Sequence, residues 1–217
     1  MIRFRHRDDA AAPAGDGGTA VTDAADEHRS PGLSAALAIP ATRAGCRILD
    51  LGPAVPSNLS FVSSFAAHLR IADLAAEVGR PGGPEGDEPT GWSEALEALD
   101  GPFDLVLAWD LFSRVEGSRC LDLVEQLRKV TRPGGALFLL IHEGPEMPAE
   151  PSVFEIRDRD RIAYRSKSSS SVRAPKIPPA EVARWLSGFR IDASFVLRHG
   201  IREYVAVRET CDEAHIS

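Results

Sequence analysis

A chain of 217 residues, 43% of them apolar, is long enough to form one domain with a hydrophobic core. Its formal net charge of −7 argues against a polycationic chain that coats nucleic acid, so there is no strong nucleic-acid signal. No stretch approaches the roughly 18 apolar residues that a membrane-spanning helix needs, and no apolar run follows the first arginines. We therefore expect neither a membrane span nor export.

Cysteine usage and composition set the expected location and boundaries. Cys46, Cys120 and Cys211 lack the close pairs or histidine neighbours of zinc sites and disulfide frameworks, which predicts no metal site and a reducing, cytoplasmic setting. Residues 1–32 are rich in Ala, Gly, Asp and Pro and nearly free of large apolar side chains, which predicts a disordered N-terminal tail. The expected domain is 33–209, followed by a C-terminal tail at 210–217.

Strands and helices are expected to alternate along the domain. Short, continuously apolar runs predict buried strands, and apolar residues at helical spacing predict helices. The expected strands are 45–51, 69–74, 103–109 and 136–142, followed by two within 190–208 that a tight turn at His199 and Gly200 makes antiparallel. The expected helices are 58–69, 92–100, 119–130 and 178–189, and a hairpin is expected within 153–165. Apolar strands that alternate with helices imply a parallel sheet covered on both faces.

Four segments carry a resemblance to a known family. "RILDLG" resembles the first motif of the class I S-adenosylmethionine-dependent methyltransferases, and "IAD" the end of their second strand. "FDLVLAWDLFSRV" resembles their fourth strand, and "LRKVTRPGGALFLLI" the helix, turn and fifth strand that follow. The resemblance covers roughly residues 40–208. It implies a Rossmann-like α/β fold, a mostly parallel sheet with a terminal antiparallel strand, and S-adenosylmethionine as cofactor.

The resemblance gives several residues expected roles. It implies that Asp50 helps to place the methionine end of the cofactor, while Trp109 and Asp110 lie beside its adenine or methyl end. Gly52 ends the first strand, at the place where open α/β sheets bind ligands. Asp73 follows Gly52 by 21 positions, close to the interval of roughly 20 residues at which an acidic side chain binds ribose hydroxyls.

The next helix offers two further candidates. Ser57 and Asn58 can cap it, and from its N-terminus they could bind the cofactor carboxylate with help from the helix dipole. Structural alternatives remain for the acidic residues and the tryptophan. Asp73 could cap a helix or face solvent, Asp50 could satisfy backbone donors in the turn, and Trp109 could pack in the core.

Two features depart from the family's pattern. The family usually has glycines where this chain has Ala54 and Pro56, and Val55 and Pro53 further restrict close approach and remove N–H donors. Residues 74–102, rich in Gly, Pro and acidic residues, leave room for one helix only. The third strand is therefore expected to be reduced or missing.

Asp110 and His142 are the candidate proton acceptors. A carboxylate directly after a buried strand is costly unless it emerges into a cleft or finds a partner. His142 ends the fifth strand, at the rim where a substrate would lie, and a histidine accepts protons near neutral pH. A surface or helix-capping role is the alternative for His142.

A basic segment lies in the expected lid-like insertion, residues 143–177. From Arg157 to Lys176 the chain has seven basic residues against Asp158 and Asp160, in an acidic protein. Focused positive charge raises the local concentration of anions, so the segment is interpreted as a lid that recruits an anionic substrate. A solvated loop is the alternative.

Together these features predict an S-adenosylmethionine-dependent methyltransferase that acts on an oxygen, nitrogen or carbon of a small or medium-sized acceptor. The alternative is a catalytically inactive protein of the same fold, a pseudoenzyme that acts as a regulatory or scaffolding partner, because a fold alone does not establish a function. A dehydrogenase fits less well, because the glycine fingerprint is absent, and a serine hydrolase lacks its Gly-x-Ser-x-Gly elbow.

Overall fold

A six-stranded sheet forms the centre of the computed structural model, which describes residues 26–74, 91–166, 169–197 and 200–210. The strand order is β10-β11-β5-β4-β2-β3. The parallel strands are β2 (Arg47–Asp50), β3 (His68–Ile71), β4 (Phe103–Trp109) and β5 (Thr131–His142). β11 (Ile201–Arg208) runs antiparallel between β5 and β10 (Phe189–Val196). The expected parallel sheet with an antiparallel strand near its end is confirmed.

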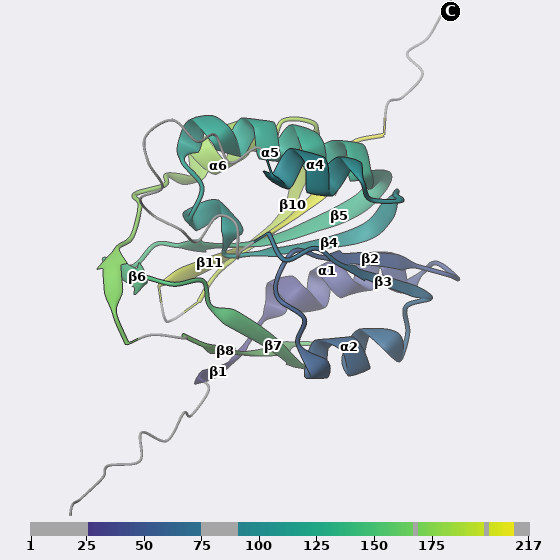
Figure 1. The fold of residues 1–217 in the computed structure, drawn as a ribbon, viewed down its shortest axis with the longest axis horizontal. Coiled ribbons are helices and arrows are strands. Elements are labelled where there is room, and N and C mark those ends of the chain that lie inside the picture. Colours follow the sequence, from purple (N-terminus) through teal and green to yellow (C-terminus); the bar gives the residue numbers. More distant parts are fainter. Residues whose placement is uncertain (1–25, 75–90, 167–168, 198–199, 211–217) are drawn as a thin grey trace, which may run out of the picture.

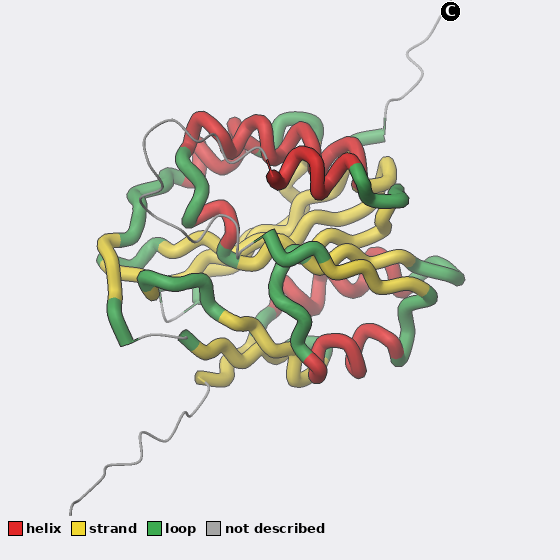
Figure 2. Tube along the Cα trace, viewed as in Figure 1, coloured by secondary structure: helices red, strands yellow, loops and turns green. Residues whose placement is uncertain are grey.

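Helices cover both faces of this sheet (Figure 1, Figure 2). One face carries α1 (Pro31–Ala41) and α2 (Pro56–Ser63). The other carries α4 (Gly91–Glu97), α5 (Gly117–Val130) and α6 (Pro179–Trp185), while a short 3-10 helix, η1 (Leu111–Ser113), follows β4. Alternate strand residues supply the two cores: Leu49 and Val106 pack with α5 and α6, whereas Ile48 and Leu107 pack with α1. Burial on both faces explains the long apolar runs of β4 and β5 at the centre of the sheet.

A second, three-stranded sheet lies along the face that carries α1 and α2 (Figure 1). β7 (Val153–Asp158) and β8 (Arg161–Arg165) form the expected hairpin, and β1 (Asp26–Arg29) pairs antiparallel with β8. Phe154 and Ile156 of β7 belong to the same buried cluster as Leu33 of α1. β6 (Glu146–Pro148) and β9 (Ser171–Arg173) form a separate two-stranded ribbon.

The expectation of a disordered tail over residues 1–32 is wrong for 26–32. Ser30 is fully buried and caps α1 by accepting a hydrogen bond from Leu33 N. Ser30 Oγ and Gly32 N both donate to the carboxylate of Glu203, which is fully buried on β11. Polar anchors and strand pairing order this segment, and an argument from the scarcity of apolar side chains could not detect them.

Some expectations concern segments outside the described residues. These segments are 1–25 of the N-terminal tail, 211–217 of the C-terminal tail, His199 of the last turn, and 75–90, where a third strand would have to begin. Among the residues that are described, α4 alone lies between β3 and β4. Because residues 75–90 lie outside the described residues, the loss of the third strand stays a prediction.

The described residues contain neither a membrane-spanning helix nor a cluster of metal ligands. None of the described helices is both long enough and apolar enough to cross a membrane. The same residues contain no group of three or more His, Cys, Asp and Glu side chains arranged to hold a metal ion. Cys46 and Cys120 are buried free thiols, and burial raises the pKa of both.

Candidate functional site

The carboxyl ends of the parallel strands meet at one edge of the sheet. β2 is followed by α2 on one face, whereas β4 leads through η1 to α5 on the opposite face (Figure 1). The chain therefore leaves neighbouring strands in opposite directions, and open α/β sheets bind ligands in the crevice outside such a point. Asp50 ends β2 and Trp109 ends β4, one on each side of this crevice.

Asp50 is buried and hydrogen-bonded at the start of the turn that follows β2. Its Oδ1 accepts from Gly52 N at 2.9 Å and from Trp109 Nε1 at 2.6 Å. Burial raises the pKa of Asp50 from 3.8 to about 6, and the hydrogen bonds that it accepts limit this rise. The negative charge of Asp73 also raises the pKa of Asp50. Asp73 is exposed two residues beyond the end of β3, so both predicted cofactor acids lie in the same region.

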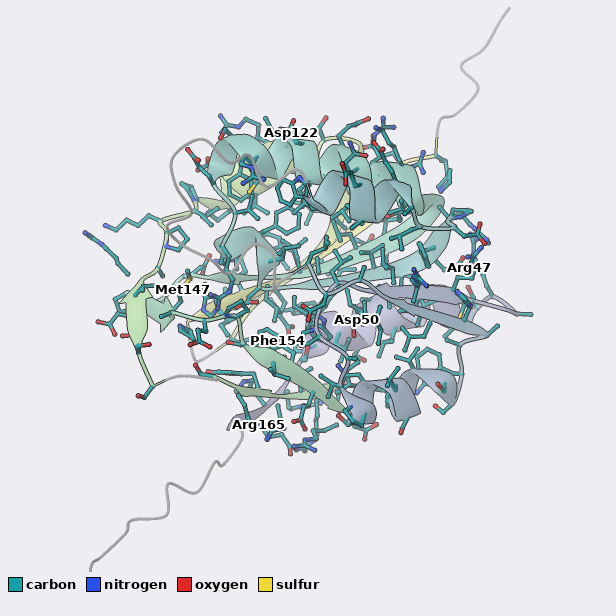
Figure 3. All side chains as sticks on the ribbon, in the orientation of Figure 1. Arg47, Asp50, Asp122, Met147, Phe154 and Arg165 are labelled. Carbon is teal, nitrogen blue, oxygen red and sulfur yellow. The ribbon has the colours of Figure 1, made fainter. Side chains whose placement is uncertain are left out.

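Trp109 turns its indole across the crevice toward Gly52. A Cβ added at Gly52 would lie 2.9 Å from Trp109 Cδ1 and 3.0 Å from Nε1, so only glycine fits beneath the ring. Phe154 of β7 stacks on the indole with a 5.2 Å centroid separation and 2° between the planes, and Phe138 contacts it edge-on at 5.9 Å. Figure 3 labels Asp50 and Phe154, which come from β2 and β7. Trp109 is only 4% exposed.

The first residues of α2 do not cap the helix as predicted. Neither Ser57 nor Asn58 caps the helix, because Val55 is the N-cap and Pro56, whose fixed φ suits the first helical turn, begins it. The Asn58 amide donates to the carbonyl oxygen of Phe154 at 2.9 Å and accepts from the amide of the second residue beyond it at 2.7 Å. Asn58 therefore attaches α2 to β7. The Ser57 hydroxyl is buried without a hydrogen-bond partner among the described residues.

Asp110 and His142 do lie together, in a buried ionic cluster. Asp110 Oδ2 accepts from Arg114 Nη2 at 2.7 Å and Nε at 3.0 Å, and His142 Nε2 lies 3.4 Å away. Burial alone would raise the pKa of Asp110, but the hydrogen bond from His142 and the charge of Arg114 more than offset it, so the pKa is lowered. Ser113 Oγ accepts from His142 N at 3.0 Å. Asp110 has found the partner that its burial requires.

Arg114 and Ser113 are the members of this cluster that were not predicted from the sequence. Arg114 is four residues after Asp110, the spacing of many helical ion pairs, and this was the available signal. The signal is weak, because most such pairs lie on exposed helix surfaces. Only the structure shows that the Arg114 side chain is 4% exposed.

The structure divides the basic segment from Arg157 to Lys176 into two groups. Arg157 and Arg165 pair with Glu155, Arg161 pairs with Glu27, and Arg159 lies over the ring of Phe65. These four arginines belong to the hairpin of β7 and β8, and Arg159 packs on a ring in the segment that follows α2. Lys167 lies outside the described residues.

The remaining two cations line a pocket at the carboxyl edge. Arg173 and Lys176 border an open cavity of about 650 Å³ that begins at Glu143, the residue after His142, and is walled by Pro145, Ile177 and other residues. Neither Arg173 nor Lys176 makes an ion pair with any other described residue. The Glu143 carboxylate is held by Arg202 Nε at 2.6 Å.

The crevice has the residue types that the expected cofactor needs, but its space is occupied by side chains. Asp50, Gly52 and Asp73 supply the acids and the glycine backbone that a nucleoside site uses. The backbone at Gly52 is nevertheless covered by the indole of Trp109, and Phe154 covers the indole in turn. In this conformation the crevice does not fit a bound nucleoside.

Comparisons with known proteins find similarity in structure but not in sequence. No model of a known protein family matches the chain, and no curated protein matches it. An S-adenosylmethionine-dependent methyltransferase from Mesorhizobium loti matches with a TM-score of 0.49 and 18% identity, covering 82% of this chain and 96% of that one. The glycopeptide N-methyltransferase MtfA complexed with sinefungin matches with a TM-score of 0.47 and 15% identity, over 82% and 87% of the two chains.

A third solved structure is the 1,6-didemethyltoxoflavin-N1-methyltransferase of Burkholderia thailandensis with bound 1,6-didemethyltoxoflavin and S-adenosylhomocysteine. Its TM-score is 0.46 at 18% identity, over 82% of this chain and 79% of that one. All three TM-scores are below 0.5 and all three identities are below 25%, so these likenesses assign the chain neither a family nor an activity. By the order and direction of its own strands, the chain has the Rossmann-like fold of class I S-adenosylmethionine-dependent methyltransferases, with no third strand among the described residues.

Proposed function

We propose that this protein binds S-adenosylmethionine at the crevice between β2 and β4 and transfers its methyl group to a small or medium-sized acceptor. The observation that carries the proposal is the convergence of Asp50 and Asp73 on the glycine turn at this crevice. In this proposal Asp73, which is exposed after β3, accepts hydrogen bonds from the ribose hydroxyls. Asp50 holds the turn through Gly52 N.

Within this proposal, His142 is a better proton acceptor than Asp110. Asp110 already receives two hydrogen bonds from Arg114, and its lowered pKa makes its carboxylate a weak base. His142 is held by Asp110 through Nε2 and by Ser113 through its backbone. Asp110 is then a positioning residue that orients the imidazole.

The proposed acceptor is anionic. Arg173 and Lys176 place positive charge beside a pocket with proline walls, next to the end of β5. Positive charge in a cleft raises the local concentration of anions. The four arginines that pair with acidic residues or pack on Phe65 no longer count toward this role.

Calorimetric titration with S-adenosylmethionine and with its demethylated product tests the cofactor site. Asp73→Asn should weaken binding by 1 kcal/mol or more, on the order expected when a hydrogen-bonding partner is removed. Asp100→Asn is the matched control, because this exposed aspartate precedes β4 at the opposite edge of the sheet. Equal affinity of Asp73→Asn and the parent chain would remove Asp73 from the site.

The covered crevice favours a second candidate, a catalytically inactive protein that acts as a regulatory or scaffolding partner. Its support is the pair Trp109 and Phe154, which closes the crevice from within the chain. This candidate predicts no heat of binding for either nucleoside up to roughly millimolar concentration. The same titration therefore separates the two candidates, provided that the chain unfolds cooperatively.

A further inference from the structure

The crevice at the carboxyl ends of β2 and β4 is filled by side chains of this chain. The Trp109 indole contacts the Gly52 backbone and donates its N–H to Asp50 Oδ1. Both groups belong to the end of β2, while the ring belongs to β4. The indole thus bridges the gap where the fold offers a ligand site.

The backbone of Trp109 is distorted in a way that aims this ring. Its φ is +48°, in the left-handed region, where a bulky residue that is not glycine is strained. The pairing of β4 with β5 also shifts register between Leu107 and Trp109. Such irregularities next to a site redirect side chains, and the redirected side chain here is the indole.

The outer side of the indole is covered by β7. Phe154 stacks on it in parallel, and the two hydrogen bonds of Asn58 fix this part of β7 to α2. The Asn58 amide also lowers the pKa of Asp50, so it lies near the carboxylate at the end of β2. Asn58 therefore holds the cover close to the carboxylate that accepts the indole N–H.

We propose that Trp109 and Phe154 are internal competitors of the nucleoside and control its access to the Gly52 backbone. Binding requires the indole to leave Gly52 and β7 to move away from it. Because the crevice is open in only a small fraction of the molecules, the apparent affinity is lower than the affinity of the open form. This inference rests on the proposed function, because it concerns the same cofactor site.

Titration of opened variants with S-adenosylmethionine tests this inference. Trp109→Gly removes the ring and relieves the positive φ, so it should bind about tenfold more tightly or better than the parent chain. Phe154→Leu loosens the cover alone and should give a smaller gain. Ile162→Val, a change in β8 of the same sheet and in the same buried cluster, is the matched control and should leave the affinity unchanged.

A spectroscopic measurement keeps the test valid if Trp109→Gly does not fold. The chain has three tryptophans, so Trp92→Phe combined with Trp185→Phe leaves Trp109 as the one emitter. Saturating cofactor should shift its emission to longer wavelength, because the buried indole becomes exposed to water. An emission spectrum that does not change while calorimetry detects binding would overturn the inference.

The possible results separate this inference from the proposed function. Equal affinity of the parent chain and Trp109→Gly overturns internal competition and leaves cofactor binding intact. Absence of binding in Trp109→Gly and Phe154→Leu, with cooperative unfolding retained, overturns both, because the opened crevice then contains no site. Tighter binding by Trp109→Gly and Phe154→Leu than by the parent chain, with unchanged affinity in the control variant, supports both the proposed function and internal competition.

Discussion

Asp50 is a buried carboxylate whose partners in the structure are hydrogen-bond donors and not cations. No ion pair among the described residues involves it, and its Oδ1 accepts from Trp109 and Gly52. Its pKa is raised to about 6, so the folded state holds a proton more tightly than the unfolded chain does. The associated stability is present below pH 3.8, the ordinary pKa, and is lost as the pH rises through about 6.

Asp50→Asn should remove this dependence on pH. The asparagine Oδ1 can still accept from Trp109 Nε1 and Gly52 N, while no charge is buried. Above pH 6 the variant should be more stable than the parent chain by up to about 3 kcal/mol, and the two should converge near pH 4. Urea unfolding at a series of pH values measures the difference. Parallel profiles for the two proteins would show that the charge of Asp50 does not cost stability.

Asp110 shows how far single residues can be predicted from a sequence. Its position after a buried strand required a cleft or a partner, and the structure supplies Arg114. The proximity of Asp110 to His142 was not predicted, and the structure explains it by the parallel pairing of β4 and β5, whose carboxyl ends share an edge. The direction of Trp109 did not follow, because it depends on a positive φ that no propensity of tryptophan predicts.

At the scale of elements, α1 is joined to the sheet through its N-terminus. Gly32 lies so close to Glu203 of β11 that an added Cβ would be 2.7 Å from Oε2 and 2.8 Å from the Glu203 Cβ. Gly32 N donates to the same carboxylate at 2.6 Å. The helix begins where the Glu203 carboxylate can accept the N–H of Gly32, and a carboxylate at this end also suits the helix dipole.

Gly32→Ala should therefore destabilise the protein by about 1–3 kcal/mol, the usual cost of overpacking a buried site. Gly117→Ala is the matched control, because a Cβ there would make ordinary contacts at 3.4 and 3.5 Å at the start of α5. The control should be neutral or more stable by roughly 0.5 kcal/mol. Urea unfolding of both variants gives the comparison. Equal stability of the two would mean that α1 is not held at Gly32.

At the scale of the whole molecule, the central sheet was predictable because its strands are indicated by patterns within short segments of the sequence. Continuous apolar runs identify β2, β4 and β5, and the turn before β11 indicates its direction. Only part of the three-stranded sheet could be predicted from the sequence. The hairpin of β7 and β8 lies in one segment, whereas β1 pairs with β8 across more than 130 residues, as the Arg29 to Asp160 bond illustrates. Short-range patterns contain no information on such a pairing.

The contribution of β1 can be isolated by comparing chains that begin at residues 26 and 30. Both lack the N-terminal segment that the structure does not describe, and they differ only in β1. Removing β1 leaves β8 as an unpaired edge and breaks the ion pairs of Arg161 with Glu27 and of Arg29 with Asp160. These pairs are exposed and stabilise little, so the loss of backbone pairing should dominate.

Hydrogen exchange measured by mass spectrometry should then rise about tenfold or more in residues 161–165 of the shorter chain. β5 and β11 should keep their protection, because their partners belong to the central sheet. The same exchange in both chains would mean that β8 is protected without β1. If protection is also lost at Phe154, the three-stranded sheet opens as a unit. The cover over Trp109 then depends on β1, although β1 pairs with β8 and not with β7.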